Sequence, residues 1–338
     1  MAHRFFSNDP DSFVIEAVEG LTIAHPGIAM ERDPLYVYRA ERVADQAQRP
    51  FGKVALVSGG GTGHEPLHAG FIGAGMLDAA VPGAVFASPT AIQVAAATQR
   101  VAGGGGVLHI IKNYTGDVIN FKIAAELCAD EGIEVRHVLV ADDVATDIAD
   151  SRVGRRGTGA TLVVEKICGA AAEEGADLDK LVQLGEAVGE NARSMALALD
   201  ACTHPGTGKK SFELGAGEVE FGVGIHGERG RKRIEFGPAD DLVAKLLEPL
   251  REALALERGD GVIAIVNGLG STQLTEQYLL TRSLRNLLAD QGIEMRRVLT
   301  GSYVTALDMS GVSITLVRAQ DEFVRLWDAP VNTPALRW

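Results

Sequence analysis

The chain has few cysteines and few aromatic residues, and both shortages narrow the class of protein to which it belongs. It has three cysteines in 338 residues, and aromatic residues make up only 5%. Cys128, Cys168 and Cys202 are widely spaced and set among apolar residues, so we expect free buried thiols in a reducing compartment and no metal site among them. With 46% hydrophobic residues, the cores should be built from Ala, Val, Leu and Ile packed in α/β layers.

Long apolar runs and an excess of positive charge are also missing. The N-terminal residues lack the apolar core of a signal peptide, and no uninterrupted apolar run approaches the roughly 18 residues that span a membrane. We therefore expect a cytoplasmic protein. The formal net charge of -13 would repel nucleic acid and anionic membranes over most of the surface. A small neutral ligand or a basic protein partner fits this charge better.

The length and the order of the expected elements predict two α/β domains. Domains of roughly 150 residues are typical, so 338 residues suit two of them. The first half alternates strands with helices, which favours a largely parallel sheet flanked by helices. Short strands with a Gly-rich turn in the second half favour a hairpin and hence a mixed sheet. We place the domains at 1–195 and 196–338.

The expected elements follow from apolar periodicity and from the residues that cap helices. For the helix at 90–102 we expect Ser88 as the N-cap, and for the helix from 118 to about 131 we expect Asp117. The helix at 178–198 would bridge the two halves. Strands are predicted at 53–58, 107–112, 135–140, 218–225, 233–236, 261–266, 295–299 and 311–317, and the remaining helices at 161–174, 240–256 and 271–290.

The strongest local signal is Gly-Gly-Gly-Thr-Gly-His-Glu-Pro-Leu-His at 59–68, directly after an apolar strand. Adjacent glycines cost conformational entropy, so they occur where φ is positive or where another molecule approaches the backbone. His64 adds a group that exchanges protons near neutral pH. The pattern predicts ligand contact, and its competitor is a tight turn in which His64 caps the next helix.

A second candidate site is Lys-Asn-Tyr-Thr-Gly-Asp at 112–117, which follows the strand at 107–112. Lys112 and Asp117 would lie at the carboxyl edge of the sheet, where open α/β folds bind ligands. An ordinary surface lysine and an ordinary helix N-cap explain the same residues equally well.

The third candidate is the loop at 222–230, which has the Gly-x-Gly-x-x-Gly spacing of a dinucleotide site. That motif needs a helix immediately after it, whereas a charged run and a strand follow here, so we reject it. His226 remains, either as a ligand-contacting side chain or as a plain hairpin histidine. The run at 206–211 is not a phosphate loop, because Thr203 stands where the first glycine must be.

Together these motifs resemble the substrate-binding subunit of dihydroxyacetone kinase, the DhaK family, from about Phe13 to about Trp327. Seven segments match in the family's order, which is too many for chance. They are 59–68, Gly-Met-Leu-Asp-Ala-Ala at 75–80, Ser-Pro-Thr at 88–90, Lys-Asn-Tyr-Thr-Gly-Asp-Val at 112–118, Gly-Arg-Arg-Gly at 154–157, Gly-Val-Gly-Ile-His-Gly-Glu at 222–228 and Asn-Gly-Leu-Gly at 267–270.

The resemblance implies a covalent mechanism. His226 would add through a ring nitrogen to the ketone carbon of dihydroxyacetone and form a hemiaminal, which glycerol cannot do because it has no carbonyl. Asp117 would act as general base on the terminal hydroxyl, and His64 would hydrogen-bond the substrate or transfer a proton. The substrate's other oxygens would be positioned by Gly60, Gly61, Ser88 and Lys112.

The resemblance also implies a division of labour between chains. We expect no cofactor or metal on this chain, with ADP or ATP and Mg²⁺ on a helical DhaL-type partner, and we expect a homodimer. Three alternatives remain: a kinase subunit for the four-carbon ketose erythrulose, a non-catalytic sensor or coactivator, and a tubulin-like GTPase. His64-Glu-Pro66 departs from the small residues that continue the GTPase loop.

Overall fold

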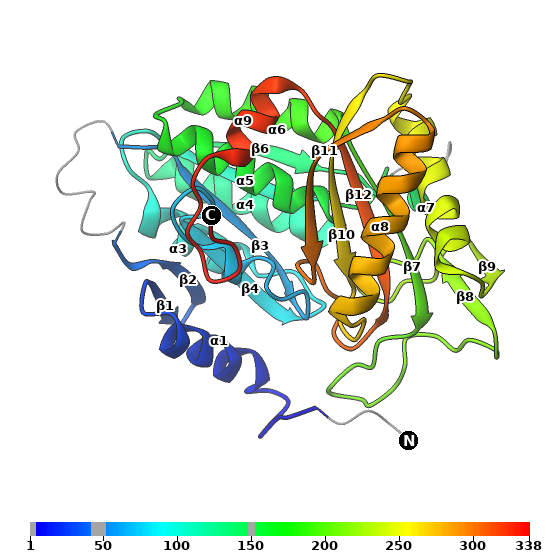
Figure 1. Cartoon of the computed structure of the whole chain (residues 1–338). Helices are drawn as coiled ribbons and strands as arrows, with labels where there is room; N and C mark the ends of the chain where they lie inside the picture. Colours follow the sequence, from blue (N-terminus) through cyan, green and yellow to red (C-terminus); the bar gives the residue numbers. More distant parts are fainter. Residues whose placement is uncertain (1–4, 42–51, 148–152) are drawn as a thin grey trace. The chain divides into compact units, whose positions relative to one another are not determined.

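The computed structural model describes residues 5–41, 52–147 and 153–338 (Figure 1). The chain forms two compact units. We call Phe6–Val140, Thr161–Ala187 and Leu326–Trp338 the N-terminal unit, and Ala141–Ala160 with Val188–Arg325 the C-terminal unit. The domain boundary between residues 195 and 196 stays a prediction. Two α/β units, one with a largely parallel and one with a mixed sheet, confirm the predicted fold class.

The N-terminal unit contains a six-stranded sheet with the strand order β1-β2-β4-β3-β5-β6. Strands β3, β4, β5 and β6 are parallel, and β1 and β2 form an antiparallel hairpin at the edge, with β2 antiparallel to β4. The strands are β1 (Ile28–Arg32), β2 (Leu35–Arg39), β3 (Ala55–Thr62), β4 (Ala79–Val85), β5 (Val107–Lys112) and β6 (Val135–Val140).

Helices lie on both faces of this sheet, so its central strands β3 and β5 are buried on both sides and β5 reads as an apolar run. Val57 and Val107 point to the face covered by α3 and α4, where they meet Phe121. Residues of the opposite parity point to the other face, where α6 packs close to β6 at Gly185. The helices of this unit are α1 (Phe13–Ala24), α3 (Ala91–Val101), α4 (Thr115–Asp130), α5 (Ala160–Glu173) and α6 (Leu178–Glu190), with a 3₁₀ turn η2 at Ala69–Phe71. Helix α9 (Asp321–Asp328) contains the last residues of the C-terminal unit and the first of the segment Leu326–Trp338.

Two helix starts differ from the predicted ones. The N-cap of α3 is Thr90 and not Ser88, because Thr90 and Gln93 form a reciprocal capping box. Helix α4 begins at Thr115 after an extended Tyr114, so Asp117 lies in its first turn and does not cap it. This position directs the Asp117 carboxylate toward buried groups, described below.

The C-terminal unit contains a mixed six-stranded sheet with the order β11-β10-β12-β7-β8-β9, in which only β10 and β11 are parallel. Its strands are β7 (Ala192–Asp200), β8 (Glu218–Phe221), β9 (Lys232–Glu235), β10 (Gly261–Gly268), β11 (Glu294–Gly301) and β12 (Ser310–Arg318). Helices α7 (Ala239–Leu254) and α8 (Leu274–Asp290) pack over an aliphatic core, and η3 (Val144–Thr146) joins it.

The helix predicted at 178–198 is wrong in its second half. Helix α6 ends at Glu190, and residues 192–200 form strand β7 between β12 and β8. Ala, Leu and Met favour helices, but here they are buried on both faces of the sheet and hydrogen-bonded on both edges. Tertiary pairing therefore overrides local propensity.

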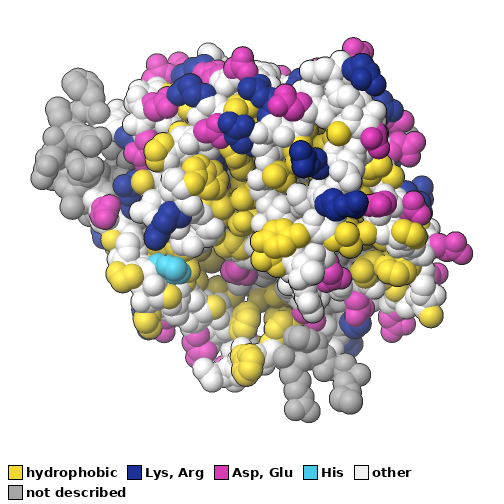
Figure 2. Space-filling view, in the orientation of Figure 1, with side chains coloured by type: hydrophobic (Ala, Val, Ile, Leu, Met, Phe, Trp, Pro, Cys, Tyr) yellow, Lys and Arg dark blue, Asp and Glu magenta, His cyan; other side chains and the backbone are white. Residues whose placement is uncertain are grey.

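The three cysteines are free and buried, as predicted. Burial raises the pKa of the Cys128 thiol to about 11 and that of Cys168 to about 12, so neither is a ready nucleophile. Across residues 5–41, 52–147 and 153–338, no helix combines the length and hydropathy needed to cross a bilayer. Acidic and basic side chains are interspersed over the face shown in Figure 2.

The packing of the glycine run predicts the effect of adding one methyl group. A Cβ at Gly61 would lie 2.6 Å from the Ala87 nitrogen and 2.8 Å from the Phe86 backbone, so Gly61→Ala should destabilise the fold by about 1–3 kcal/mol. At Gly20, inside α1, a Cβ meets nothing within 4 Å, and Gly20→Ala should be neutral or stabilise by about 0.5–1 kcal/mol. Urea unfolding midpoints measure both, and a Gly61→Ala midpoint equal to that of the wild type would contradict this packing.

Candidate functional site

The glycine run at 59–61 is extended strand backbone and not a turn. Positive φ occurs at Gly63 (111°) and not within the triplet, so of the two explanations for adjacent glycines, positive φ does not apply to residues 59–61. The triplet is small because the protein's own atoms approach it. A Cβ at Gly59 would lie 2.7 Å from the Val81 carbonyl oxygen, and one at Gly60 would collide with the Lys112 ammonium. Strand β3 therefore packs tightly against its neighbours up to the site.

Lys112, at the carboxyl end of β5, is fully buried and holds the centre of a polar cluster. Its Nζ donates a hydrogen bond to the Gly59 carbonyl oxygen at 2.9 Å and lies 2.7 Å from His68 Nε2. The Asp117 carboxylate in α4 lies 3.7 Å from the same nitrogen. The surface-lysine interpretation of Lys112 is thus wrong, because the side chain is fully buried and its ammonium faces buried acceptors.

Burial controls the charges of this cluster. Loss of hydration lowers the pKa of Lys112, although the charges of Asp117 and Glu165 oppose the shift. His68 is buried beside Lys112, and both the burial and that charge lower its pKa well below the usual value, so its ring is neutral. Burial raises the pKa of Glu165, on α5, to about 8 despite the nearby lysine. Its Oε1 lies 2.6 Å from His68 Nδ1.

The other predicted residues of this unit lie around the same sheet edge. His64 is fully buried and stacks on Phe86, with ring centroids 5.2 Å apart. Ser88 lies against the first turn of α4, since a Cβ at Gly116 would be 2.6 Å from its hydroxyl oxygen. The structure therefore brings the six predicted residues of the N-terminal unit to the carboxyl ends of β3, β4 and β5. They are Gly60, Gly61, His64, Ser88, Lys112 and Asp117.

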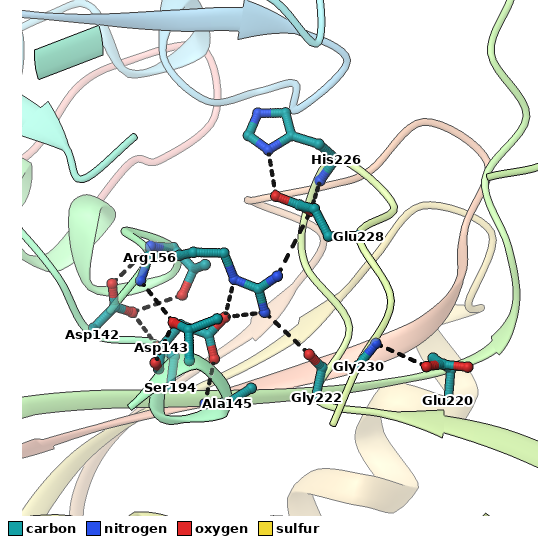
Figure 3. A network of polar contacts seen from close by, with 12 residues as sticks. Asp142, Asp143, Ala145, Arg156, Ser194, Glu220, Gly222, His226, Glu228 and Gly230 are labelled. Atoms are coloured by element: carbon teal, nitrogen blue, oxygen red, sulfur yellow. Dashed lines mark hydrogen bonds and ion pairs between the residues drawn. The ribbon is translucent and has the colours of Figure 1, made fainter. Parts of the chain in front are cut away.

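His226 lies in the C-terminal unit, in the loop between β8 and β9, where a carboxylate fixes its orientation (Figure 3). The backbone N–H of His226 donates to Glu228 Oε2 at 2.9 Å, and the ring Nδ1 lies 3.2 Å from Glu228 Oε1. An ionised carboxylate only accepts, so Nδ1 carries the proton. In the neutral ring the other nitrogen, Nε2, is then unprotonated, and it points away from the network in Figure 3.

Arg156 ties this loop to the rest of its unit. The guanidinium pairs with Asp143 at 2.6 Å, donates to the Gly222 carbonyl at 3.1 Å and lies 4.0 Å from Glu228. Burial raises the pKa of Glu228, but the hydrogen bond from His226 and the charges of His226 and Arg156 outweigh it and lower the pKa to about 2. Glu228 is thus a carboxylate at any ordinary pH.

The rejection of a dinucleotide site at 222–230 is confirmed. Strand β8 precedes this loop and the antiparallel strand β9 follows it, so no helix N-terminus is available for a pyrophosphate. Glycine is required at 224 for an internal reason, because a Cβ there would lie 2.6 Å from the Glu228 carboxyl carbon and 2.4 Å from Arg156. The spacing reflects packing of the His226 loop.

Comparisons with known proteins identify the family of the chain. A model of the Dak1 domain matches residues 19–335. The chain belongs to the Dak1 domain family. It is 44% identical, over 98% of both sequences, to the PEP-dependent dihydroxyacetone kinase, dihydroxyacetone-binding subunit DhaK, of Escherichia coli. The resemblance to the DhaK family is therefore confirmed.

Two further relatives differ in role. The chain is 40% identical to the L-erythrulose 1-kinase of Mycolicibacterium smegmatis, matching over 98% of this chain and 58% of that protein. It also resembles the solved structure of the dihydroxyacetone kinase operon co-activator Dha-DhaQ, with a TM-score of 0.88 and 32% identity over 95% of this chain and 97% of that one. The family thus includes kinases for two ketoses and a co-activator.

Sequence reasoning missed four residues that shape these two clusters. Glu228 lies in the motif at 222–228 and Arg156 in the motif at 154–157, but neither was given a role, and Asp143 follows β6 without any recognisable spacing. Glu165 offered one signal, a carboxylate inside the otherwise apolar start of α5, since charged residues are almost never fully buried unless paired.

Arg155 and Arg156 are neighbours in the sequence, and replacing each of them tests the buried pair between Arg156 and Asp143. Arg156→Ala leaves buried Asp143 without its cation, which should cost about 3–5 kcal/mol. Arg155→Ala removes a pair with the half-exposed Asp147 and should cost about 1 kcal/mol or less. Chemical unfolding measures both, and equal losses would contradict the buried pair.

The loss of stability caused by Arg156→Ala should depend on pH. The pKa of Asp143 is already raised to about 6 by burial, and removing Arg156 raises it further. Burying a neutral carboxyl group costs much less free energy than burying an unpaired carboxylate. The destabilisation by Arg156→Ala should therefore be small at about pH 5 and grow as the pH rises toward about 8.

Proposed function

We propose that this chain is the dihydroxyacetone-binding subunit of a dihydroxyacetone kinase. It would bind the ketose as a hemiaminal on His226 and present its terminal hydroxyl to a nucleotide-carrying DhaL-type partner. The observation that carries this proposal is the carboxylate of Glu228 on His226 Nδ1, which leaves Nε2 as a nucleophile. The 44% identity to a DhaK subunit over 98% of both sequences supports it.

The covalent step needs a neutral imidazole and a proton for the substrate oxygen. The Nε2 lone pair forms a bond with the ketone carbon, the carbonyl π pair moves to oxygen, and His64 in its imidazolium form gives that oxygen a proton and becomes neutral. The ring becomes positively charged, and the Glu228 carboxylate stabilises it through the Nδ1–H hydrogen bond. Release reverses these movements.

The phosphoryl step needs a base at the terminal hydroxyl. Asp117 supports this role because its Oδ1 is buried and has no hydrogen-bond partner among the described residues, while its other oxygen faces Lys112. Asp117 Oδ1 would take the hydroxyl proton as the substrate oxygen attacks the phosphoryl group. Gly60, Gly61, Ser88 and Lys112 would position the remaining oxygens. The nucleotide and Mg²⁺ belong to the partner in this proposal, and we propose a cytoplasmic homodimer.

A four-carbon ketose is the second candidate substrate, because an L-erythrulose 1-kinase is 40% identical to this chain. Erythrulose has the same carbonyl next to a hydroxymethyl group, so His226 would bond to it in the same way. A co-activator role, suggested by the structural match to Dha-DhaQ, requires ketose binding without the base. The presence of Asp117 beside Lys112 favours the kinase over this role.

Mass spectrometry tests the covalent step. Dihydroxyacetone should add its mass to the wild type and to His204→Ala, whose histidine is exposed in the same unit, but not to His226→Ala. An adduct that persists on His226→Ala would assign the bond to another residue.

Kinetics test the base. Asp117→Asn should keep the adduct and lower kcat by about 10²–10⁴-fold, because general base catalysis contributes on that order. Phosphorylation at the wild-type rate, measured with the partner subunit and either ketose, would remove Asp117 from this role. The ratio of kcat/KM for dihydroxyacetone and erythrulose in the same assay decides the substrate.

A further inference from the structure

Two buried residues without an assigned role connect Lys112 to a second helix. His68 lies after β3, with 5% of its surface exposed, and Glu165 lies on α5, fully buried. The contacts form a row: Glu165 Oε1 to His68 Nδ1 at 2.6 Å, and His68 Nε2 to Lys112 Nζ at 2.7 Å. These residues are far apart in sequence, so only the fold brings them together.

The donors and acceptors in this row allow one arrangement when Lys112 is charged. An ammonium has three donors and no acceptor, so His68 Nε2 must accept from it. A neutral histidine that accepts at Nε2 carries its proton on Nδ1, which can then donate only to an ionised Glu165. The low pKa of His68 agrees with a neutral ring.

This arrangement determines where the Lys112 charge lies. Two of its protons are directed to the Gly59 carbonyl and His68 Nε2, and the Asp117 carboxylate lies 3.7 Å away. Without His68 as acceptor, one buried donor would be unsatisfied and the ammonium would be free to rotate away from Asp117. The position of the cation beside Asp117 thus depends on the row behind it.

We propose that His68 and Glu165 are positioning residues: Glu165 fixes the Nδ1–H tautomer of His68, and His68 Nε2 then holds the Lys112 ammonium next to Asp117. The inference rests on the proposed function of Asp117 as base. His68 and Glu165 do not touch the substrate in this proposal, but they determine the electrostatic environment of Asp117, which does.

A competing arrangement has the same number of protons. If one proton moves from Lys112 to His68 Nε2 and one from His68 Nδ1 to Glu165, all three groups are neutral. Burial of Glu165, which raises its pKa to about 8, and burial of Lys112, which lowers its pKa, both favour this state. The charges of Asp117 and Glu165 favour the charged Lys112. The two arrangements differ in the tautomer of His68, which is measurable.

Nitrogen NMR of the wild type with ¹⁵N-labelled histidine, assigned with His68→Gln, tests the tautomer without any substrate or partner. We expect a protonated Nδ1 and an unprotonated Nε2 at His68 at about pH 7. A proton on Nε2 would overturn the proposal, because that nitrogen could no longer accept from Lys112.

Kinetics test the consequence for catalysis. Glu165→Gln keeps a hydrogen bond to His68 and removes the charge, and we expect kcat to fall about 10- to 100-fold with little change in KM or in adduct mass. Glu173→Gln, on the same helix but paired with Lys53 and Arg39, is the control and should keep the wild-type kcat. Equal kcat values for these two variants would overturn the proposal.

A pair of substitutions at His68 separates hydrogen bonding from bulk. His68→Gln offers an oxygen acceptor to Lys112 and should retain more activity than His68→Leu, which offers none, by about 10-fold. Equal activities of the two folded variants would count against the proposal. If the wild type itself phosphorylates no ketose, the proposed function fails, while the tautomer of His68 still decides the positioning of Lys112.

Discussion

The complete burial of the Lys112 side chain is the constraint on which the N-terminal unit's site depends. Lys112 has no exposed surface, so each of its donors must find an acceptor within the protein. The Gly59 carbonyl supplies one, which draws β3 against β5 and leaves room only for glycine at residue 60. His68 supplies another, and Asp117 lies beside it as the counter-charge. Gly60, His68 and Asp117 are thus all matched to the Lys112 side chain.

A histidine of the C-terminal unit is also oriented by a carboxylate. His226, like His68, has a carboxylate at Nδ1, and in both rings Nε2 is left with its lone pair. The surroundings then separate the two. Nε2 of His68 is occupied by Lys112 in a buried row, whereas the His226 side chain is 18% exposed and its loop is held by Arg156. The same contact at Nδ1 therefore leaves His68 as an acceptor for Lys112 and His226 as a candidate nucleophile, because the surroundings of Nε2 differ.

Much of the fold was predictable because its signals are local. Strand β5 has the predicted ends, since a buried parallel strand reads as an apolar run bounded by glycine and polar residues. The edge strand β6 also has the predicted ends. The helix predicted through residue 198 was wrong because the pairing of β7 with β12 and β8 leaves no local trace in an Ala- and Leu-rich segment. The start of α4 was misplaced by the same kind of local ambiguity, which made Asp117 look like a cap.

The sequence by itself determined the fold class, the family and the candidate residues, because short motifs with fixed spacing carry all three. Only the tertiary structure decided the electrostatic partners. Glu165 meets His68 across 97 residues, and Arg156 reaches Gly222 across 66. Such pairs have no periodicity and no spacing rule, since folding alone sets the distance between their side chains. The protonation state of each histidine follows from those partners, so it too is a property of the fold and not of the sequence read locally.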